Sequence, residues 1–312
     1  MVARKRRLVR VREQRKSTKH LLIIAIVLFV GAIITYKLLP AHFFDSSLNG
    51  SEAKETKQNA VPKDVKKEVD KQRQINQIST PPSYRIPILM YHYIEFVKDP
   101  NDKTRASLTT SPLTLSAEIK TLQDAGFTFL TQSQLADILD NKMPLPEKPV
   151  LLTFDDGYQD FYTDAYPILK KYQVKSTQYV IAGFLDHYNH LTTPELVEIA
   201  KEGLVEIGAH TMTHAWLKGR GVEEVGWQVS QSKEVLEKKI GRDVVSFAYP
   251  YGAFDLQAIQ IVESSGFRSA VSTIPGIMQN QENRFFLYRL RPGGRIGPAL
   301  LNWLNQTKFS AF

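Results

Sequence analysis

The segment Pro149-Val150-Leu151-Leu152-Thr153-Phe154 runs directly into Asp155-Asp156-Gly157. Its unbroken apolar character predicts a buried strand, so two adjacent carboxylates follow the carboxyl end of that strand. In parallel α/β folds this end of a strand delivers side chains into the active site. One aspartate can bind a cation while the other takes up a proton. The structural alternative is a turn or helix cap in which Gly157 supplies a positive φ, which explains one aspartate better than two.

A second polar segment, His210-Thr211-Met212-Thr213-His214, follows another apolar run. One helical turn or a tight loop can bring imidazoles four residues apart to a common point, as a divalent cation requires. This spacing alone is weak evidence, because it often occurs by chance at a protein surface. Together with Asp155 and Asp156 it favours a metal site at one rim of the fold, and hence a metal-assisted hydrolase. The chain has no cysteine, so any metal must use nitrogen and oxygen ligands.

Apolar runs alternate with helical patterns from about residue 83 onward, which predicts an α/β fold with a parallel sheet. Seven or so βα units suggest a barrel. We expect Thr193 to cap a helix that stops at Gly203. The predicted strands are 86–91, 127–130, 150–154, 177–181, 205–207, 245–248 and 268–272. The predicted helices are 116–125, 133–139, 159–172, 193–203, 222–240 and 255–266.

The net charge of +8 is concentrated at the N-terminus. Residues 1–20 contain nine Lys or Arg against one acid, Glu13, so the remainder is formally neutral. A basic tail before an apolar segment is typical of a cytoplasmic flank. The neutral remainder offers no phosphate-binding surface by composition, so we expect no nucleic-acid partner.

The apolar segment itself runs from Leu21 to Leu39, with Lys37 able to reach the interface. We predict a transmembrane anchor at 21–39, a cytoplasmic tail at 1–20 and a single-pass protein whose catalytic part, 83–312, is extracytoplasmic. A cleaved signal peptide is the alternative, although residues 40–43 show no convincing cleavage site. Residues 40–82 are polar and poor in large apolar side chains, which predicts a disordered stalk.

Three ordered motifs resemble those of the polysaccharide deacetylases, the NodB-homology carbohydrate esterases: Thr153 to Gly157, His210 to His214, and Tyr249-Pro250-Tyr251-Gly252. The resemblance spans roughly residues 86–290. The segment Pro87-Ile88-Leu89-Met90-Tyr91-His92-Tyr93 is similar to the opening of the permuted subgroup that acts on poly-N-acetylglucosamine and cell-wall polysaccharides. The resemblance implies a distorted (β/α)7 barrel after the anchor and the stalk.

The resemblance also implies roles for individual residues. Asp156, His210 and His214 would bind one divalent metal ion, with Zn²⁺ expected first and Co²⁺, Ni²⁺ or Mn²⁺ as alternatives. Asp155 would be the general base and His92 the general acid. The backbone N–H of Tyr251 would hold the oxyanion, a contact typically worth about 3 kcal/mol.

One position departs from the family pattern, because Ala248 stands where many relatives have an arginine that holds the catalytic aspartate. Arg289 and Arg291 are candidates to replace it, since a late strand there would close the barrel beside the first. The alternative is that both arginines pair with surface carboxylates or with the stalk.

Several side chains close to the motifs are candidate substrate contacts. Aromatic rings can stack on the apolar faces of sugars, and Tyr158 and Trp216 are the first candidates because each lies just past a motif. The wider set of candidates is Tyr91, Tyr93, Phe161, Tyr249, Arg289 and Arg291.

The sequence therefore predicts a metal-dependent N-deacetylase acting on N-acetylglucosamine units of a cell-surface polysaccharide. Two alternatives remain open: an O-acetyl carbohydrate esterase on the same barrel, and a surface glycan-binding protein without catalysis. The expected partners are the glycan and, through residues 21–39, the membrane.

Overall fold

The computed structural model describes residues 81–306. The predicted tail, the predicted anchor and residues 40–80 of the predicted stalk lie outside the described residues. Within residues 81–306 no helix is long and apolar enough to cross a membrane.

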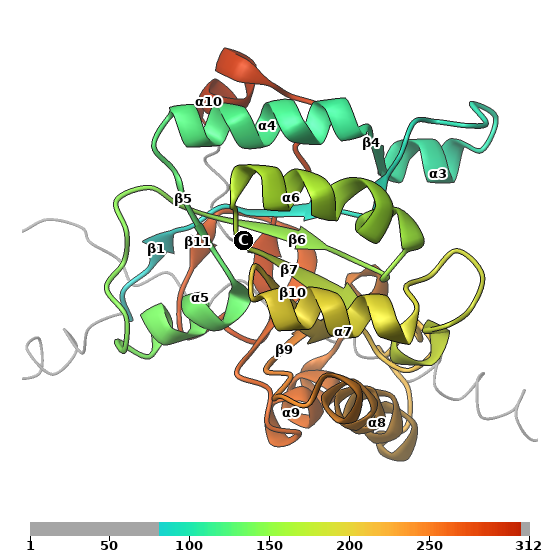
Figure 1. Cartoon of the computed structure of the whole chain (residues 1–312). Coiled ribbons are helices and arrows are strands. Elements are labelled where there is room, and N and C mark those ends of the chain that lie inside the picture. The colour runs from blue at the N-terminus through green and yellow to red at the C-terminus, as the bar shows by residue number, and fades with distance from the viewer. Residues whose placement is uncertain (1–80, 307–312) are drawn as a thin grey trace, which may run out of the picture. The chain divides into compact units, whose positions relative to one another are not determined.

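The described part of the chain alternates between strands and helices (Figure 1). Its strands are β1 (Tyr84–Arg85), β2 (Ile88–Tyr91), β3 (Tyr93–Ile94), β4 (Thr109–Thr110), β5 (Thr128–Leu130), β6 (Pro149–Phe154), β7 (Ser176–Val180), β8 (Val205–Ala209), β9 (Ser246–Ala248), β10 (Ser269–Pro275), β11 (Met278–Gln279) and β12 (Leu287–Arg289). Its helices are α3 (Lys103–Leu108), α4 (Pro112–Asp124), α5 (Gln132–Leu139), α6 (Tyr166–Tyr172), α7 (Thr193–Glu202), α8 (Val222–Ile240), α9 (Leu256–Ser264) and α10 (Gly297–Gln306). Short helical turns are η2 (Phe161–Ala165), η3 (Ala182–Phe184) and η4 (Pro250–Gly252).

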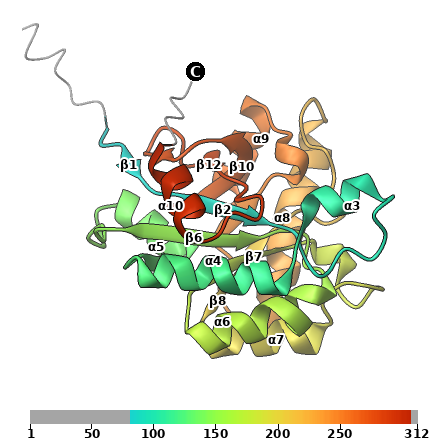
Figure 2. The ribbon, with the colours of Figure 1, turned by 90° about the horizontal axis from the view of Figure 1, so that it is seen from above.

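The main sheet is a nearly closed barrel of parallel strands in the order β12-β10-β9-β8-β7-β6-β2. Two hydrogen bonds of Leu290 join the two ends of the sheet. The Met90 N–H donates to the Leu290 carbonyl at 2.9 Å, and the Leu290 N–H donates to the Ile88 carbonyl at 2.8 Å. In Figure 2, β12 and α10 accordingly lie beside β2. The predicted closure of the barrel by a late strand is confirmed. Strand β5 is additional and pairs with the first half of β6.

The strands are continuous apolar runs because both of their faces are covered. All six residues of β6 are buried, with helices packed outside and other strands' side chains inside. A small cluster contains one residue from each of several strands, including Leu151 and Leu287. Side chains two residues further along a strand share its face, so Thr153 and Arg289 lie above this cluster on the same side. The barrel interior thus changes from apolar to polar toward the carboxyl ends of the strands.

Most predicted elements are present, with corrected boundaries. The N-cap of α7 is Thr192 rather than Thr193, because Thr192 and Glu195 form a reciprocal capping box. The helix ends as predicted at Gly203, whose φ is +80°. Helix α4 begins at Pro112, four residues before the predicted start, because Ser111 accepts from the N–H of Thr114.

The predicted helix 159–172 is interrupted. A wide turn, η2, occupies Phe161–Ala165, and a regular helix, α6, begins only at Tyr166. Pro167 explains the break, because it has no N–H to donate and its ring would clash with the carbonyl four residues earlier. Helices α3 and α10 were not predicted from the sequence.

Candidate metal and catalytic site

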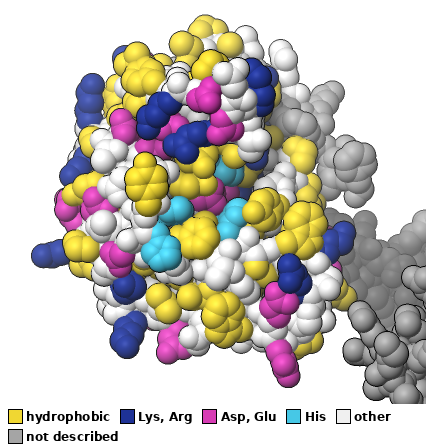
Figure 3. Space-filling view, turned by 90° about the vertical axis from the view of Figure 1, so that its right-hand side faces the viewer, with side chains coloured by type: hydrophobic (Ala, Val, Ile, Leu, Met, Phe, Trp, Pro, Cys, Tyr) yellow, Lys and Arg dark blue, Asp and Glu magenta, His cyan; other side chains and the backbone are white. Residues whose placement is uncertain are grey.

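The predicted site residues follow the carboxyl ends of different strands, which meet at one rim of a parallel barrel. His92 follows β2, the two aspartates follow β6 and His210 follows β8. Figure 3 shows this face of the molecule, where histidine side chains gather around a hollow with acidic side chains between them.

Asp155 and Asp156 are adjacent in sequence, yet they face different partners. Asp156 has φ +75° and Gly157 also has φ +75°, so two left-handed residues turn the chain sharply after β6. A Cβ at Gly157 would lie 3.2 Å from the Val180 side chain, which leaves little room for a larger residue. Such strained backbone is typical of functional sites. The turn gives two neighbouring carboxylates two separate environments.

Asp156 lies against both histidines of the second motif. Its Oδ1 is 3.3 Å from Nε2 of His210 and 3.2 Å from Nε2 of His214. One ligand atom from each of the three residues lies within 4.8 Å of the others. The sequence expectation that these residues come together is therefore met by the structure.

The opposite ring nitrogens of the two histidines are already occupied. His210 Nδ1 lies 2.7 Å from the Ala248 carbonyl, to which it donates, so its Nε2 carries a free lone pair. His214 Nδ1 lies 2.9 Å from the Tyr251 hydroxyl. Both imidazoles thus present Nε2 to the carboxylate, in the orientation found at metal centres.

This arrangement fits a divalent cation. Asp156 Oδ1 is buried and accepts no hydrogen bond within the described residues. A buried carboxylate oxygen without a donor is costly unless a cation or proton lies against it. Burial opposes charging of His210, but the Asp156 carboxylate outweighs burial and raises the pKa of that imidazole. Two imidazoles and one carboxylate form a ligand set of the kind used by catalytic zinc, with coordination positions left open.

Asp155 is held by Arg289. The guanidinium donates from both terminal nitrogens to the two carboxylate oxygens, each at 2.7 Å, and its Nε donates to the Ser272 carbonyl at 2.7 Å. Burial would raise the pKa of Asp155, but Arg289 outweighs burial and lowers it. Asp155 is therefore fixed in place and kept ionised.

Of the two arginines considered as replacements at Ala248, Arg289 makes the contact. It is 1% exposed, so its place as a candidate substrate contact is wrong: a guanidinium enclosed in the barrel has no surface for a sugar. Arg291 is exposed and lines a pocket beside His92. Closure of the barrel gives the two arginines different surroundings: Arg289 lies inside against Asp155, and Arg291 lies outside at the pocket.

His92 lies on the other side of Asp155, with its Nε2 3.9 Å from Oδ2. Burial is the largest influence on His92 and lowers its pKa, against the opposing effect of the two aspartates. A lowered pKa reduces the protonated fraction of this imidazole near neutral pH, so the role of His92 as general acid stays a prediction.

The loop between the two ligand histidines is not helical. Thr211 has φ +66° and His214 has φ +57°. Gln228, from α8, stabilises this loop by accepting from the N–H groups of Met212 at 3.0 Å and Thr213 at 3.1 Å. Sequence reasoning missed Gln228. The available signal was a polar residue on the buried face of an amphipathic helix.

The aromatic candidates divide between surface and core. Trp216 is 49% exposed and its ring centroid lies 6.0 Å from that of Tyr251. Tyr158 is partly buried and stacks on Tyr93 at 4.0 Å. Tyr249 is 0% exposed and packs against Phe247 and Phe254, so the expectation that it contacts substrate is wrong. The other buried aromatics of the candidate set are Tyr91 and Phe161.

Comparisons with known proteins point to one family. A family model described as polysaccharide deacetylase matches residues 142–270. The Bacillus subtilis (strain 168) protein YxkH, provisionally named a polysaccharide deacetylase, is 32% identical over 232 residues, which cover 74% of this chain and 80% of YxkH. A poly-β-1,6-N-acetyl-D-glucosamine N-deacetylase of Staphylococcus aureus is 24% identical over 61% of this chain and 70% of its own length. Among solved structures, Streptococcus pyogenes deacetylase PplD in complex with acetate superposes with a TM-score of 0.65 at 30% identity, covering 73% of this chain and 100% of that chain.

A parallel barrel with an Asp/His/His cluster and a second, separately held aspartate at its rim has the residue types that metal-assisted hydrolysis uses. The chain belongs to the polysaccharide deacetylase family, and it is accordingly a hydrolase that acts on carbon–nitrogen bonds.

Proposed function

We propose that the protein is a metal-dependent N-deacetylase that hydrolyses acetamide groups of N-acetylglucosamine residues in a cell-surface polysaccharide and releases acetate. The observation that carries this proposal is the separation of two adjacent carboxylates into two roles. Asp156 faces a pair of imidazoles, whereas Asp155 is kept ionised by Arg289. The name of the Staphylococcus aureus relative supports this class of substrate.

The chemistry follows from the environment of each residue. A divalent cation held by Asp156, His210 and His214 would polarise an acetamide carbonyl and lower the pKa of a water molecule. Asp155 accepts the proton of the attacking water, because Arg289 and the buried barrel fix its carboxylate. His92 lies next to that carboxylate and donates a proton to the departing amine.

The oxyanion of the tetrahedral intermediate is assigned to the backbone N–H of Tyr251. Tyr251 is the second residue of η4, where an N–H has no acceptor within the helical turn. The backbone of Tyr251 is left-handed, with φ +59°. The hydroxyl of the same residue is the partner of His214 Nδ1, so this short turn lies beside a proposed metal ligand. One such donor typically contributes about 3 kcal/mol to stabilising the transition state.

We assign Zn²⁺ as the resident metal, because two imidazoles and one carboxylate make up a known set of protein ligands for catalytic zinc. Co²⁺, Ni²⁺ and Mn²⁺ use the same nitrogen and oxygen donors, and the metal bound in the cell depends on supply. Poly-N-acetylglucosamine, peptidoglycan and an N-acetylglucosamine unit that links a wall polysaccharide to peptidoglycan are the candidate glycans.

We propose that the enzyme lies in the cell membrane, anchored by residues 21–39, with the catalytic domain outside the cytoplasm. The basic residues 1–20 and the apolar run that follows them support this proposal. External protease added to intact cells tests this orientation. It should remove the catalytic domain and leave the basic tail protected, whereas full protection of the chain would place the domain inside.

The activity is tested with the full-length chain loaded with Zn²⁺ or Co²⁺, by measuring acetate release from N-acetylglucosamine oligomers and from isolated cell wall. Asp155→Asn should abolish release, and His92→Asn should do so while leaving the Asp155 to Arg289 ion pair intact. Turnover of O-acetylated sugars alone would establish an esterase. Oligomer binding without release of acetate by the folded, loaded protein would establish a glycan-binding protein.

A further inference from the structure

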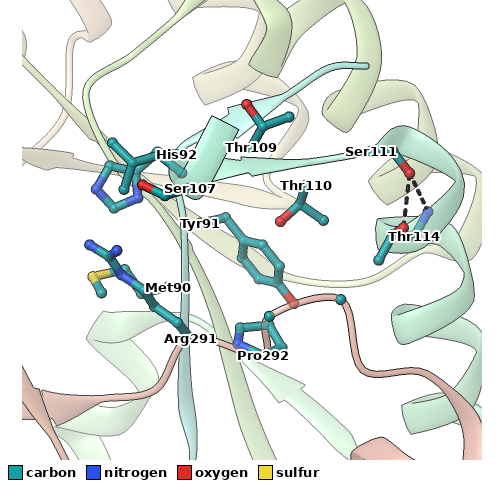
Figure 4. Close-up of a pocket in the computed structure, with 13 residues that line it drawn as sticks. Met90, Tyr91, His92, Ser107, Thr109, Thr110, Ser111, Thr114, Arg291 and Pro292 are labelled. Carbon is teal, nitrogen blue, oxygen red and sulfur yellow. Dashed lines mark hydrogen bonds between the residues drawn. The ribbon is translucent and has the colours of Figure 1, made fainter. Parts of the chain in front are cut away.

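A pocket of about 220 Å³ opens beside His92 (Figure 4), and none of Asp156, His210 and His214 lines it. It lies between the end of β2, the turn that follows β12 and the segment leading into α4. Its lining includes His92, Thr110, Arg291, Gly293 and Gly294, and contains no aspartate or glutamate. The proposed reaction uses only His92 of this set.

Arg291 is the cation of this pocket, and its charge is uncommitted. It is exposed, and within residues 81–306 it makes no hydrogen bond or ion pair, in contrast to Arg289 two residues earlier. The backbone bonds of Leu290 to β2 fix the chain on which Arg291 stands. Figure 4 shows its side chain extending toward His92. The strand therefore directs an unpaired guanidinium toward the reacting centre.

The remaining polar groups of the pocket include unsatisfied donors. Gly293 has φ +60° and Gly294 has φ +73°, and neither N–H donates to an acceptor in the described part of the chain. A Cβ at Gly294 would meet nothing within 4 Å, so the turn borders open space. The Thr110 hydroxyl also has no hydrogen-bond partner among the described residues. Ser111 and Thr114 satisfy one another at the start of α4, as the dashed lines of Figure 4 show.

A free guanidinium, unsatisfied N–H and O–H donors and no carboxylate together favour an anion over a neutral sugar or a cation. A free amine on a neighbouring sugar would be repelled by Arg291, whereas a phosphate or carboxylate could take both of its terminal N–H groups. The pocket shares His92 with the reacting centre, so an anionic group attached to the substrate can reach it.

We propose that this pocket is a subsite for an anionic group, a phosphate or a carboxylate, carried by the glycan next to the acetamido sugar that is hydrolysed, and that Arg291 selects for it. The proposal rests on the proposed N-deacetylase function and narrows it. The preferred substrate would be an acidic glycan or an acidic linkage unit rather than a neutral homopolymer.

The test compares N-acetylglucosamine oligomers of one length that are neutral, carry a phosphate on the neighbouring residue, or carry a carboxylate there. The full-length, metal-loaded enzyme, Arg291→Gln and Arg242→Gln are assayed for acetate release. Arg242 is a matched control, because it lies in a different pocket beside the amino end of β8. The same oligomers are titrated calorimetrically, so that selectivity is measured both in turnover and in binding.

The native enzyme should have a kcat/KM about tenfold higher for an anionic oligomer than for the neutral one, as one charge-assisted contact provides. Arg291→Gln should reduce this ratio about tenfold, and Arg242→Gln should leave it unchanged. The anionic oligomer with the larger ratio identifies the group as phosphate or carboxylate. The subsite would be overturned if Arg291→Gln and the native enzyme had the same ratio of kcat/KM, or of affinity, for anionic over neutral oligomers. If the native enzyme released acetate from none of the oligomers, the proposed function would be overturned. The ratio of affinities for anionic and neutral oligomers would then still test the subsite.

Discussion

Arg289 on β12 and Asp155 after β6 form a two-point ion pair inside the barrel, although 134 residues separate them in sequence. The contact joins the last strand of the barrel to the carboxylate of Asp155, so barrel closure and the orientation of Asp155 depend on each other. Arg289 also donates to Thr153 at 3.2 Å and to the Ser272 carbonyl. Its donors are thus divided between β10 and β6 with the turn that follows β6.

Arg289→Lys should lower kcat/KM for acetate release about 100-fold, because a lysine keeps the charge but cannot hold both oxygens of Asp155 in one plane. Arg289→Gln should also lower the free energy of unfolding by about 3–5 kcal/mol, since it leaves a buried carboxylate unpaired. Acetate release and urea unfolding measure the two effects. Arg284→Lys is the control, as Arg284 pairs with Asp140 at 3.0 Å elsewhere in the fold. Equal activity in Arg289→Lys and the native enzyme would contradict the positioning role.

Metal binding should stabilise the folded protein. Zn²⁺ at about 100 times its Kd should add about 2.7 kcal/mol to the free energy of unfolding, because the three ligands come together only in the folded chain. Thermal unfolding with and without chelator measures the shift. Asp156→Asn should lose it, whereas His187→Gln should keep it, since His187 stacks on Phe184 and is not part of the cluster. An unchanged shift in Asp156→Asn would place the metal elsewhere.

Gly183→Ala should weaken metal binding about tenfold or more through the loop that carries His214. A Cβ at Gly183 would lie 2.4 Å from the Met212 carbonyl oxygen, and the Gly183 N–H already donates to that oxygen at 2.9 Å. The backbone of the loop would have to move. Gly226→Ala is the matched control, because nothing lies within 4 Å of its Cβ and alanine stabilises a helix interior by about 0.5–1 kcal/mol. Calorimetric titration of zinc into both variants tests this, and equal affinities would refute it.

Glu118 should make stability depend on pH. This glutamate is fully buried on α4, where burial raises its pKa to about 7 despite a hydrogen bond from the Tyr91 hydroxyl at 2.9 Å. The folded-state pKa lies above the unfolded value, so the stabilising effect of protonation is complete below about pH 4.5 and is lost as pH rises through about 7. The loss is on the order of 3 kcal/mol.

Glu118→Gln keeps an acceptor for Tyr91 without a titrating group. Urea unfolding of both proteins at pH 5 and pH 8 should therefore show a smaller decrease in the variant, by up to about 3 kcal/mol. The difference between the two proteins isolates Glu118 from other groups, such as Asp160, whose pKa burial also raises to about 7. Parallel pH dependences would show that Glu118 does not titrate in this range.

Some site features were predictable because their signals are local. The apolar run before Asp155 indicates its strand, and the spacing of His210 and His214 indicates a shared ligand position. The resemblance to the polysaccharide deacetylases then implied which aspartate faces the imidazoles. Each signal lies within a few residues, and the alternation of strands and helices brings such segments to one rim.

Other features depend on packing that no local pattern contains. Tyr249 lies in a motif but turns into the core, and Gln228 supports the histidine loop from a helix that follows it in sequence. The break before α6 depends on Pro167, whose effect is visible in the sequence only when the helix register is known.

The sequence by itself determined the α/β class, the strand that carries Asp155 and Asp156, and the residues able to bind a metal, because periodicity and side-chain chemistry are local properties of a chain. Only the tertiary structure decided that Arg289 rather than Arg291 holds Asp155. The physical reason is closure of the barrel: pairing of Leu290 with β2 turns Arg289 inward onto a buried carboxylate and leaves Arg291 outside with its charge unpaired.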